Sequence, residues 1–182
     1  MEAGAAPARR FPYSAGVLFG LGLGGFFDGI VFHQLLQWHH MLTSDGYPPD
    51  SLHNVQVNVF WDGVFHASTY IFAVAGLILL WRAAHRRHLW WSGRLLTGTL
   101  LIGFGAFNVV EGLVDHQILG IHHVNETVPR ETWIYWDLGF LAWGAIMLVA
   151  RSDRRPPRSR RHGGELNAAR GGLLVRPPDA EG

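Results

Sequence analysis

Residues 14–38 read SAGVLFGLGLGGFFDGIVFHQLLQW, an apolar run that contains a single acid, Asp28. An α-helix rises ~1.5 Å per residue, so ~20 apolar residues suffice to cross the ~30 Å hydrocarbon core of a bilayer. The run is too long for the apolar part of a secretory signal, and it lacks an A-x-A cleavage site. It therefore predicts a retained transmembrane helix.

Three further windows share this character: residues 57–81, 95–119 and 133–150. Of the 182 residues, 48% are hydrophobic and only 16% are charged, whereas a soluble domain usually carries ~25% charged residues. The sequence thus predicts an all-α membrane protein whose fold is a bundle of four transmembrane helices, with the lipid bilayer as its main partner. Cysteine is absent, which excludes disulfides, thiolate metal sites and cysteine nucleophiles.

Arginine placement predicts the orientation of the bundle, because short loops rich in arginine stay cytoplasmic. Arginines cluster before the first window, between the second and third, and after the fourth. We therefore expect a multi-pass protein of the bacterial inner membrane with both termini cytoplasmic. Residues 1–13 form a cytoplasmic segment, 14–150 the transmembrane domain, and 151–182 a disordered basic tail that lies on anionic lipids. No nucleic-acid partner is expected; a membrane partner complex stays open.

Two stretches of the chain match each other closely. Residues 28–41 read DGIVFHQLLQWHHM and residues 111–124 read EGLVDHQILGIHHV, so that an acid, a His-Gln pair and a His-His pair recur at fixed spacing. The Trp-Asp pair at 61–62 likewise corresponds to the pair at 136–137. This pattern predicts two tandem helix-pair repeats, at about 14–82 and 95–150, related by an axis along the membrane normal.

The predicted spans contain acids but no lysine or arginine beside them. Each charged side chain near the centre of a bilayer costs at least ~2.5 to 3.5 kcal/mol, so the acids must be protonated, paired with histidine or bound to a cation. The sequence predicts a metal site in the outer half of the bundle, with the following candidates: Asp28, His33, Asp62, His66, Glu111, Asp115, His116 and Asp137. A second set lies at the outer helix ends, where histidines often serve only as polar interface residues: His39, His40, His122 and His123.

Helical spacing refines these candidates. Asp62 and His66 are four residues apart, so we expect them on one face, where they could chelate one ion. Asp28 and His33 are five residues apart, which turns their side chains ~140° from each other in an α-helix unless a π-bulge intervenes. His33 and His40 are seven apart and are expected to share a face that leads outward. Asp28 and Glu111 lie deeper than the other candidates, which suggests a supporting or proton-conducting role.

Histidine and carboxylate without thiolate suit a transition metal ion such as Zn, Fe, Mn or Cu. Haem held between His33 and His116 is the competing cofactor, although so many acids do not suit a haem pocket. The Glu-x-x-His motif of di-iron bundles is missing. Several functions therefore stay open: metal-dependent redox chemistry or metal handling, a proton or cation pathway, and an assembly scaffold without catalysis. Whether the protein is an enzyme, and which residues would be catalytic, is not decided.

The segments GFFDGIVFHQLLQWHHM, WDGVFH and GLVDHQILGIHHV resemble a bacterial family of integral membrane proteins defined by a domain of unknown function, DUF2243. The resemblance covers about residues 14–150 and leaves the basic tail outside. It implies a four-helix inner-membrane protein and brings no activity and no catalytic residue with it.

Overall fold

The computed structural model describes residues 12–85 and 91–150. It contains four helices long and apolar enough to cross a membrane: Tyr13–Leu35, Leu52–Ala84, Gly93–Leu119 and Arg130–Val149. These confirm the predicted all-helical fold, and the described ranges contain no strand. The predicted basic tail and nearly all of the predicted N-terminal segment lie outside the described residues.

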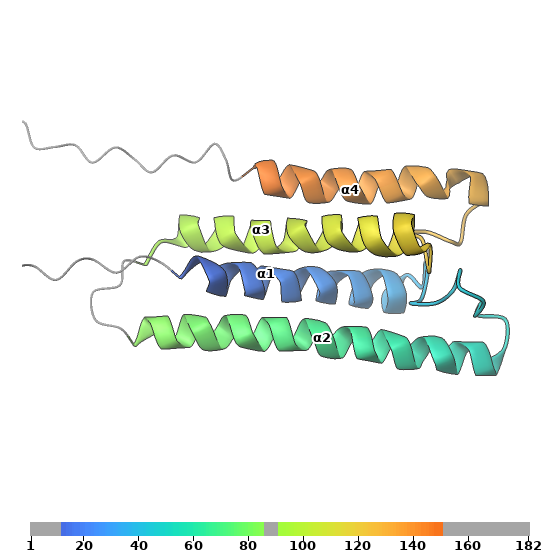
Figure 1. Cartoon of the computed structure of the whole chain (residues 1–182), viewed down its shortest axis with the longest axis horizontal. Helices are drawn as coiled ribbons and strands as arrows, with labels where there is room; N and C mark the ends of the chain where they lie inside the picture. The colour runs from blue at the N-terminus through green and yellow to red at the C-terminus, as the bar shows by residue number, and fades with distance from the viewer. Residues whose placement is uncertain (1–11, 86–90, 151–182) are drawn as a thin grey trace, which may run out of the picture.

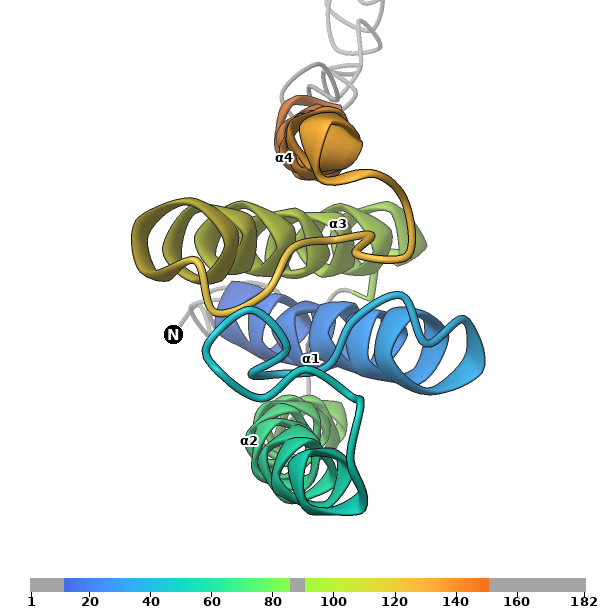
Figure 2. The same ribbon diagram turned by 90° about the vertical axis from the view of Figure 1, so that its right-hand side faces the viewer.

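Two helices occupy the centre of the molecule. They are α1 (Tyr13–Phe27) and α3 (Gly93–Glu111), which pack against each other; α2 (Leu52–Ala84) packs on α1, and α4 (Trp133–Val149) packs on α3. All four run along the long axis of the molecule (Figure 1). Seen along that axis, they follow the order α2, α1, α3, α4, and the two central helices cross (Figure 2).

Glycines allow the central helices to touch backbone to backbone. A Cβ atom added to Gly20 of α1 would overlap the carbonyl oxygen of Leu100, and one added to Gly103 of α3 would overlap the carbonyl oxygen of Val17. Small residues at such contacts are typical of helix pairs in membranes, where close van der Waals packing drives association. The crossing of α1 and α3 is therefore closed to larger side chains.

The polarity of the protein is inverted relative to a soluble domain. The hydrophobic residues that are buried are few and mostly small, whereas many large ones, such as Ile71 and Ile146, are exposed at 66% each. Buried positions are instead rich in polar and charged side chains, including Asn58 and Asn108. This distribution suits a chain whose exposed surface meets lipid and whose polar groups must be satisfied internally.

Both central helices change their winding at one end. α1 continues into the π-helix η1 (Asp28–Leu35), and α3 continues into the π-helix η2 (Gly112–Leu119). π-helical turns are rare and occur mostly at functional sites. The first helix ends after Leu35, because Gln37 adopts the left-handed conformation with a φ of 49°. The third helix ends similarly at Gly120, whose φ is 62°.

The chain then folds back over the ends of the π-helices as two outer loops, residues 36–51 and 120–129 (Figure 2). Backbone hydrogen bonds tie these loops together, from Ser44 N to Ile121 O at 3.0 Å and from Glu126 N to Trp38 O at 3.0 Å. The expectation that His33 and His40 share one helix face is wrong, because the helix ends before His40 and the backbone reverses.

Candidate metal centre

The π-helices bring together residues that an α-helix would separate. His33 Nε2 lies 3.1 Å from Asp28 Oδ2, and His116 Nε2 lies 2.9 Å from Glu111 Oε1. Each pair is five residues apart, and a π-helix closes its turns between residues i and i+5. Both imidazoles are almost fully buried, at 0% and 2% exposure. Asp28 and Glu111, expected in a deeper layer, therefore contact the buried histidines directly.

The outer loops add two more imidazoles from above. The ring centroid of His39 lies 4.3 Å from that of His33, and the centroid of His122 lies 5.0 Å from that of His116. His39 and His122 stack on each other, with centroids 4.6 Å apart and planes within 4°. Four histidines from two π-helices and two loops therefore form one buried cluster.

Each loop imidazole is held by the backbone of the opposite half of the chain. His39 Nδ1 donates to the carbonyl oxygen of Val124 at 2.9 Å, and His122 Nδ1 donates to that of Met41 at 3.1 Å. A carbonyl oxygen can only accept, so each ring carries a proton on Nδ1. His39 Nε2 has no hydrogen-bond partner among the described residues, whereas His122 Nε2 lies 3.1 Å from Glu111 Oε1. Burial also lowers the pKa of His39 well below its ordinary value, with the charges of His122 and His33 acting in the same direction. His39 is therefore a neutral imidazole with Nε2 ready to bind a cation.

Two buried carboxylates lie beside the imidazoles of the π-helices, and one of them forms a hydrogen bond. Asp62 Oδ1 accepts a hydrogen bond from His33 Nδ1 at 2.9 Å. In the second half, Asp137 Oδ1 lies 3.6 Å from His116 Nδ1, beyond hydrogen-bond distance. A carboxylate or carbonyl on the far nitrogen of a histidine is the usual arrangement around metal-binding imidazoles, because it fixes the tautomer and the direction of the ring.

Asp62 and Asp137 also fasten the outer loops to the helices. Asp62 accepts hydrogen bonds from Met41 N at 2.9 Å and His40 Nδ1 at 2.8 Å. Asp137 accepts the corresponding hydrogen bonds from the other loop, from Val124 N at 3.0 Å and from His123 Nδ1 at 2.7 Å. The matched sequence segments thus make matching contacts, while the tandem repeat itself stays a prediction of the sequence.

Unpaired carboxylate oxygens lie at the bottom of the histidine cluster. Both oxygens of Asp28 and Oε2 of Glu111 are buried without a hydrogen-bond partner among the described residues. The 3.1 Å approach of His33 Nε2 to Asp28 lacks hydrogen-bond geometry, so it leaves both atoms unsatisfied. A buried polar group without a partner is costly. Carboxylate oxygens and imidazole lone pairs that converge in this way favour a bound cation.

Three groups of residues could each hold a metal ion, because one ligand atom from every member lies within 4.8 Å of the others in that group. Each group includes at least one histidine of the cluster: His33, His39 and His122; Glu111, His116 and His122; and His33, His40 and Asp62. The third overlaps the hydrogen bonds that hold Asp62, whose oxygens are already occupied by N–H donors. The first two contain the imidazole nitrogens that face the unpaired acids.

Two of the predicted ligands do not join these groups. His66 Nδ1 bonds to the backbone oxygen of Asp62 at 2.8 Å, and its Nε2 abuts Gly29. The expected chelate between the side chains of Asp62 and His66 is not formed, because Asp62 turns toward the outer loop. Asp115 is half-buried and stands outside the three groups found in the described part of the chain.

The second set of candidates divides in a similar way. His39 and His122 enter the cluster, whereas His40 and His123 lie at its rim and hydrogen-bond to Asp62 and Asp137. Gly120 could have indicated from the sequence that His122 and His123 lie outside the helix, since a glycine after an apolar run often ends a helix in the left-handed conformation. Its presence places the His-His pair beyond the helix, on a segment free to fold back.

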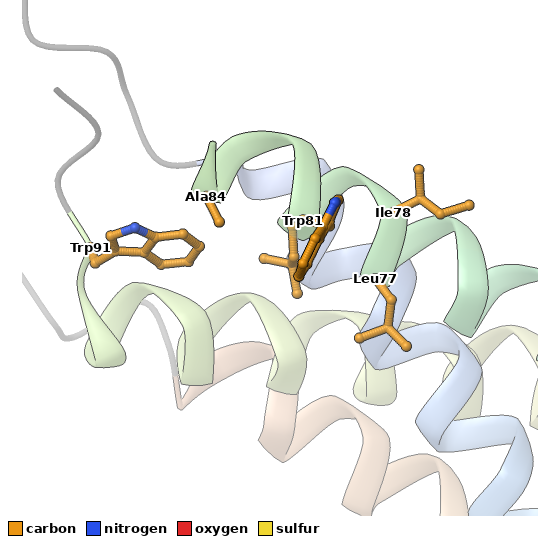
Figure 3. Close-up of a pocket in the computed structure, with 6 residues that line it drawn as sticks. Leu77, Ile78, Trp81, Ala84 and Trp91 are labelled. Atoms are coloured by element: carbon orange, nitrogen blue, oxygen red, sulfur yellow. The ribbon is translucent and has the colours of Figure 1, made fainter. Parts of the chain in front are cut away.

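A separate groove lies at the opposite end of the molecule. It has a volume of about 450 Å³ and is lined by apolar residues: Leu77, Ile78, Leu80, Trp81, Ala84 and Trp91 (Figure 3). None of these side chains offers a carboxylate or imidazole. The groove therefore has no part in the cation chemistry of the histidine cluster.

Comparison with known proteins places the chain in a family without assigning an activity. No curated protein and no solved structure matches it. Residues 15–152 match the model of a family described as "Predicted membrane protein (DUF2243)". The match spans the four helices, the π-helices and both outer loops. The chain therefore belongs to the DUF2243 family of predicted membrane proteins.

Proposed function

We propose that this protein binds a transition metal at the buried histidine cluster and uses it for redox chemistry or for metal handling. The observation that carries the proposal is the direction of the imidazoles. The loop histidines are fixed through Nδ1 by carbonyl oxygens, so that Nε2 faces the interior: that of His39 has no partner among the described residues, and that of His122 lies 3.1 Å from Glu111 Oε1. A set of imidazole and carboxylate donors suits Zn, Fe, Mn or Cu.

Charge balance supports a resident cation. Four acids are buried with at most 6% exposure: Asp28, Asp62, Glu111 and Asp137. Within the described ranges, the ion pairs that these acids form are all with histidines. Histidine compensates a carboxylate only when it is protonated, and uncompensated carboxylates in a membrane-spanning bundle are expensive. A metal cation supplies the missing charge.

The packing of the cluster favours an ion over haem. A haem held between His33 and His116 needs an open slot between the two rings. That space is taken by His39, whose centroid lies 4.3 Å from His33 and 6.2 Å from His116. His122 is similarly placed, at 5.6 Å and 5.0 Å. A porphyrin would have to displace both loop histidines together with the backbone hydrogen bonds that hold them.

The same packing favours a resident ion over a cation pathway. One route from the cluster toward the far end of the bundle runs between α1 and α3. Gly20 and Gly103 bring the two backbones into contact there, so no side-chain-lined channel continues between them. We also propose that the cluster lies in the outer half of a bacterial inner membrane and that both termini are cytoplasmic, as the arginine distribution predicts.

Metal analysis of the purified protein tests this proposal. The full chain is isolated in mild detergent without chelator, and its transition metals are quantified by mass spectrometry alongside an absorption spectrum. We expect stoichiometric metal and no haem absorption. The double variant Asp28→Asn/Glu111→Gln should lose the metal, since it removes both unpaired carboxylates while preserving side-chain volume.

His53→Gln provides the matched control, because His53 is exposed in the first turn of α2 and belongs to none of the three ligand groups. It should retain the metal content of the wild type. Wild-type protein that contains no transition metal and acquires none on incubation with Zn²⁺ or Co²⁺ would contradict the proposal. A haem spectrum would instead support the competing cofactor.

A further inference from the structure

We infer that the cluster holds two metal ions side by side, one in each half, with the carboxylates of Asp28 and Glu111 between them. The inference rests on the proposed metal site and adds its nuclearity. One ion is assigned to His33 and His39 of the first half, and the other to His116 and His122 of the second. Each half thus contributes one acid, one π-helix imidazole and one loop imidazole.

The spacing of the ligand atoms supports two positions. Bonds of ~2.1 Å from imidazole or carboxylate to metal place opposite ligands of one ion ~4.2 Å apart. Six ligands of a single ion would therefore form one group within that span. The structure instead places five of these donors in two groups, which share only His122. Asp28 stands outside both groups, with Oδ2 3.1 Å from His33 Nε2. Among the described residues, no such group contains both His33 and His116.

The stacked loop imidazoles give an independent indication of the separation. The rings of His39 and His122 are parallel within 4° and their centroids lie 4.6 Å apart. Their Nδ1 atoms are anchored to carbonyls of opposite halves, and a ligand nitrogen of each ring lies within 4.8 Å of one on the other. A spacing of this order is compatible with the ~3.5–4 Å typical of two-metal sites.

The buried carboxylates can bridge two ions. The second oxygens of Asp28 and Glu111, which lack partners among the described residues, are then available to bridge the pair, as carboxylates do in dinuclear sites of helix bundles.

Counting bound Co²⁺ in half-site variants tests the inference. The full-length protein in detergent is stripped of metal, dialysed to equilibrium against Co²⁺, and analysed for cobalt per chain. We expect two ions in the wild type, one in His33→Gln, one in His116→Gln and none in the double variant. His53→Gln should bind two, since it leaves the cluster intact.

The outcomes separate the nuclearity from the metal site itself. A single ion in the wild type overturns the two-ion inference and leaves the proposed metal site standing, whereas no bound cobalt overturns both. Electron paramagnetic resonance of the wild type alone supplies a test that needs no variant. The signal per cobalt should fall when the second equivalent binds, because bridged ions couple magnetically; an unchanged signal per cobalt overturns the bridged pair.

Discussion

Replacing Asp62 with asparagine removes a carboxylate that holds two imidazoles, and the structure allows its effect on metal affinity to be worked out. Asp62 Oδ1 accepts from His33 Nδ1 at 2.9 Å and Oδ2 accepts from His40 Nδ1 at 2.8 Å. An asparagine keeps one acceptor and turns an N–H donor toward the other imidazole. His33 then loses either its partner or the negative charge that strengthens its Nε2 as a ligand. Such outer partners are worth ~10- to 100-fold in metal affinity, which corresponds to ~1.4 to 2.8 kcal/mol.

The matched variant Asp137→Asn should weaken metal binding less. Asp137 Oδ1 is 3.6 Å from His116 Nδ1, so this imidazole has no hydrogen bond to lose there. Competition of Co²⁺ between the protein and a chromophoric chelator at fixed pH measures both affinities. The exposed pair of Asp50 and Asn54 provides a control, because Asp50→Asn makes the same chemical change far from the cluster. Equal affinities for Asp62→Asn, Asp50→Asn and wild type would refute the reasoning.

Three further predictions concern stability. Gly103→Val should lower the melting temperature in detergent, because a side chain there meets the backbone oxygen of Val17 and overpacking typically costs ~1–3 kcal/mol. Gly63→Ala should have little effect, because the space around Gly63 is open. Equal melting temperatures for both variants would argue against backbone contact between α1 and α3. In the metal-free protein, the contribution of His39 to stability should be fully present above about pH 6.5 and be lost as the pH falls, because burial holds the pKa of His39 below that of the unfolded chain and protonation then favours unfolding. Thermal melts of metal-free wild type and His39→Gln across that range check this, and identical pH profiles would count against it. Removing the metal with a chelator should lower the melting temperature, and adding Co²⁺ should restore it, because a ligand that binds only the folded state stabilises that state. A melting temperature that neither treatment changes would count against an ion bound to the folded protein.

Hydropathy was sufficient to predict the four spans, because the apolar windows are long and are separated by polar loops. It overestimated the first helix, since Leu36 and Trp38 extend the apolar window past the helix end at Leu35 and across the backbone reversal at Gln37. An apolar average measures side-chain polarity and does not report backbone conformation.

The acids and histidines of the site were recognisable as candidates because charge inside an apolar span needs compensation. Their assembly was harder to predict. The π-helical winding of residues 28–35 is not encoded by a distinctive composition, so an α-helical wheel separates Asp28 from His33 when the structure joins them. His39 reaches the cluster only because the outer loop folds back, a tertiary effect that helical spacing does not capture.

X-ray absorption at the edge of the metal that copurifies with the protein tests the central claim most directly. The account predicts nitrogen and oxygen ligands at ~2.0–2.2 Å, with the outer-shell scattering of several imidazoles, and loss of that scattering in His39→Gln/His122→Gln. A metal surrounded only by water-like oxygen, without imidazole scattering, would contradict it.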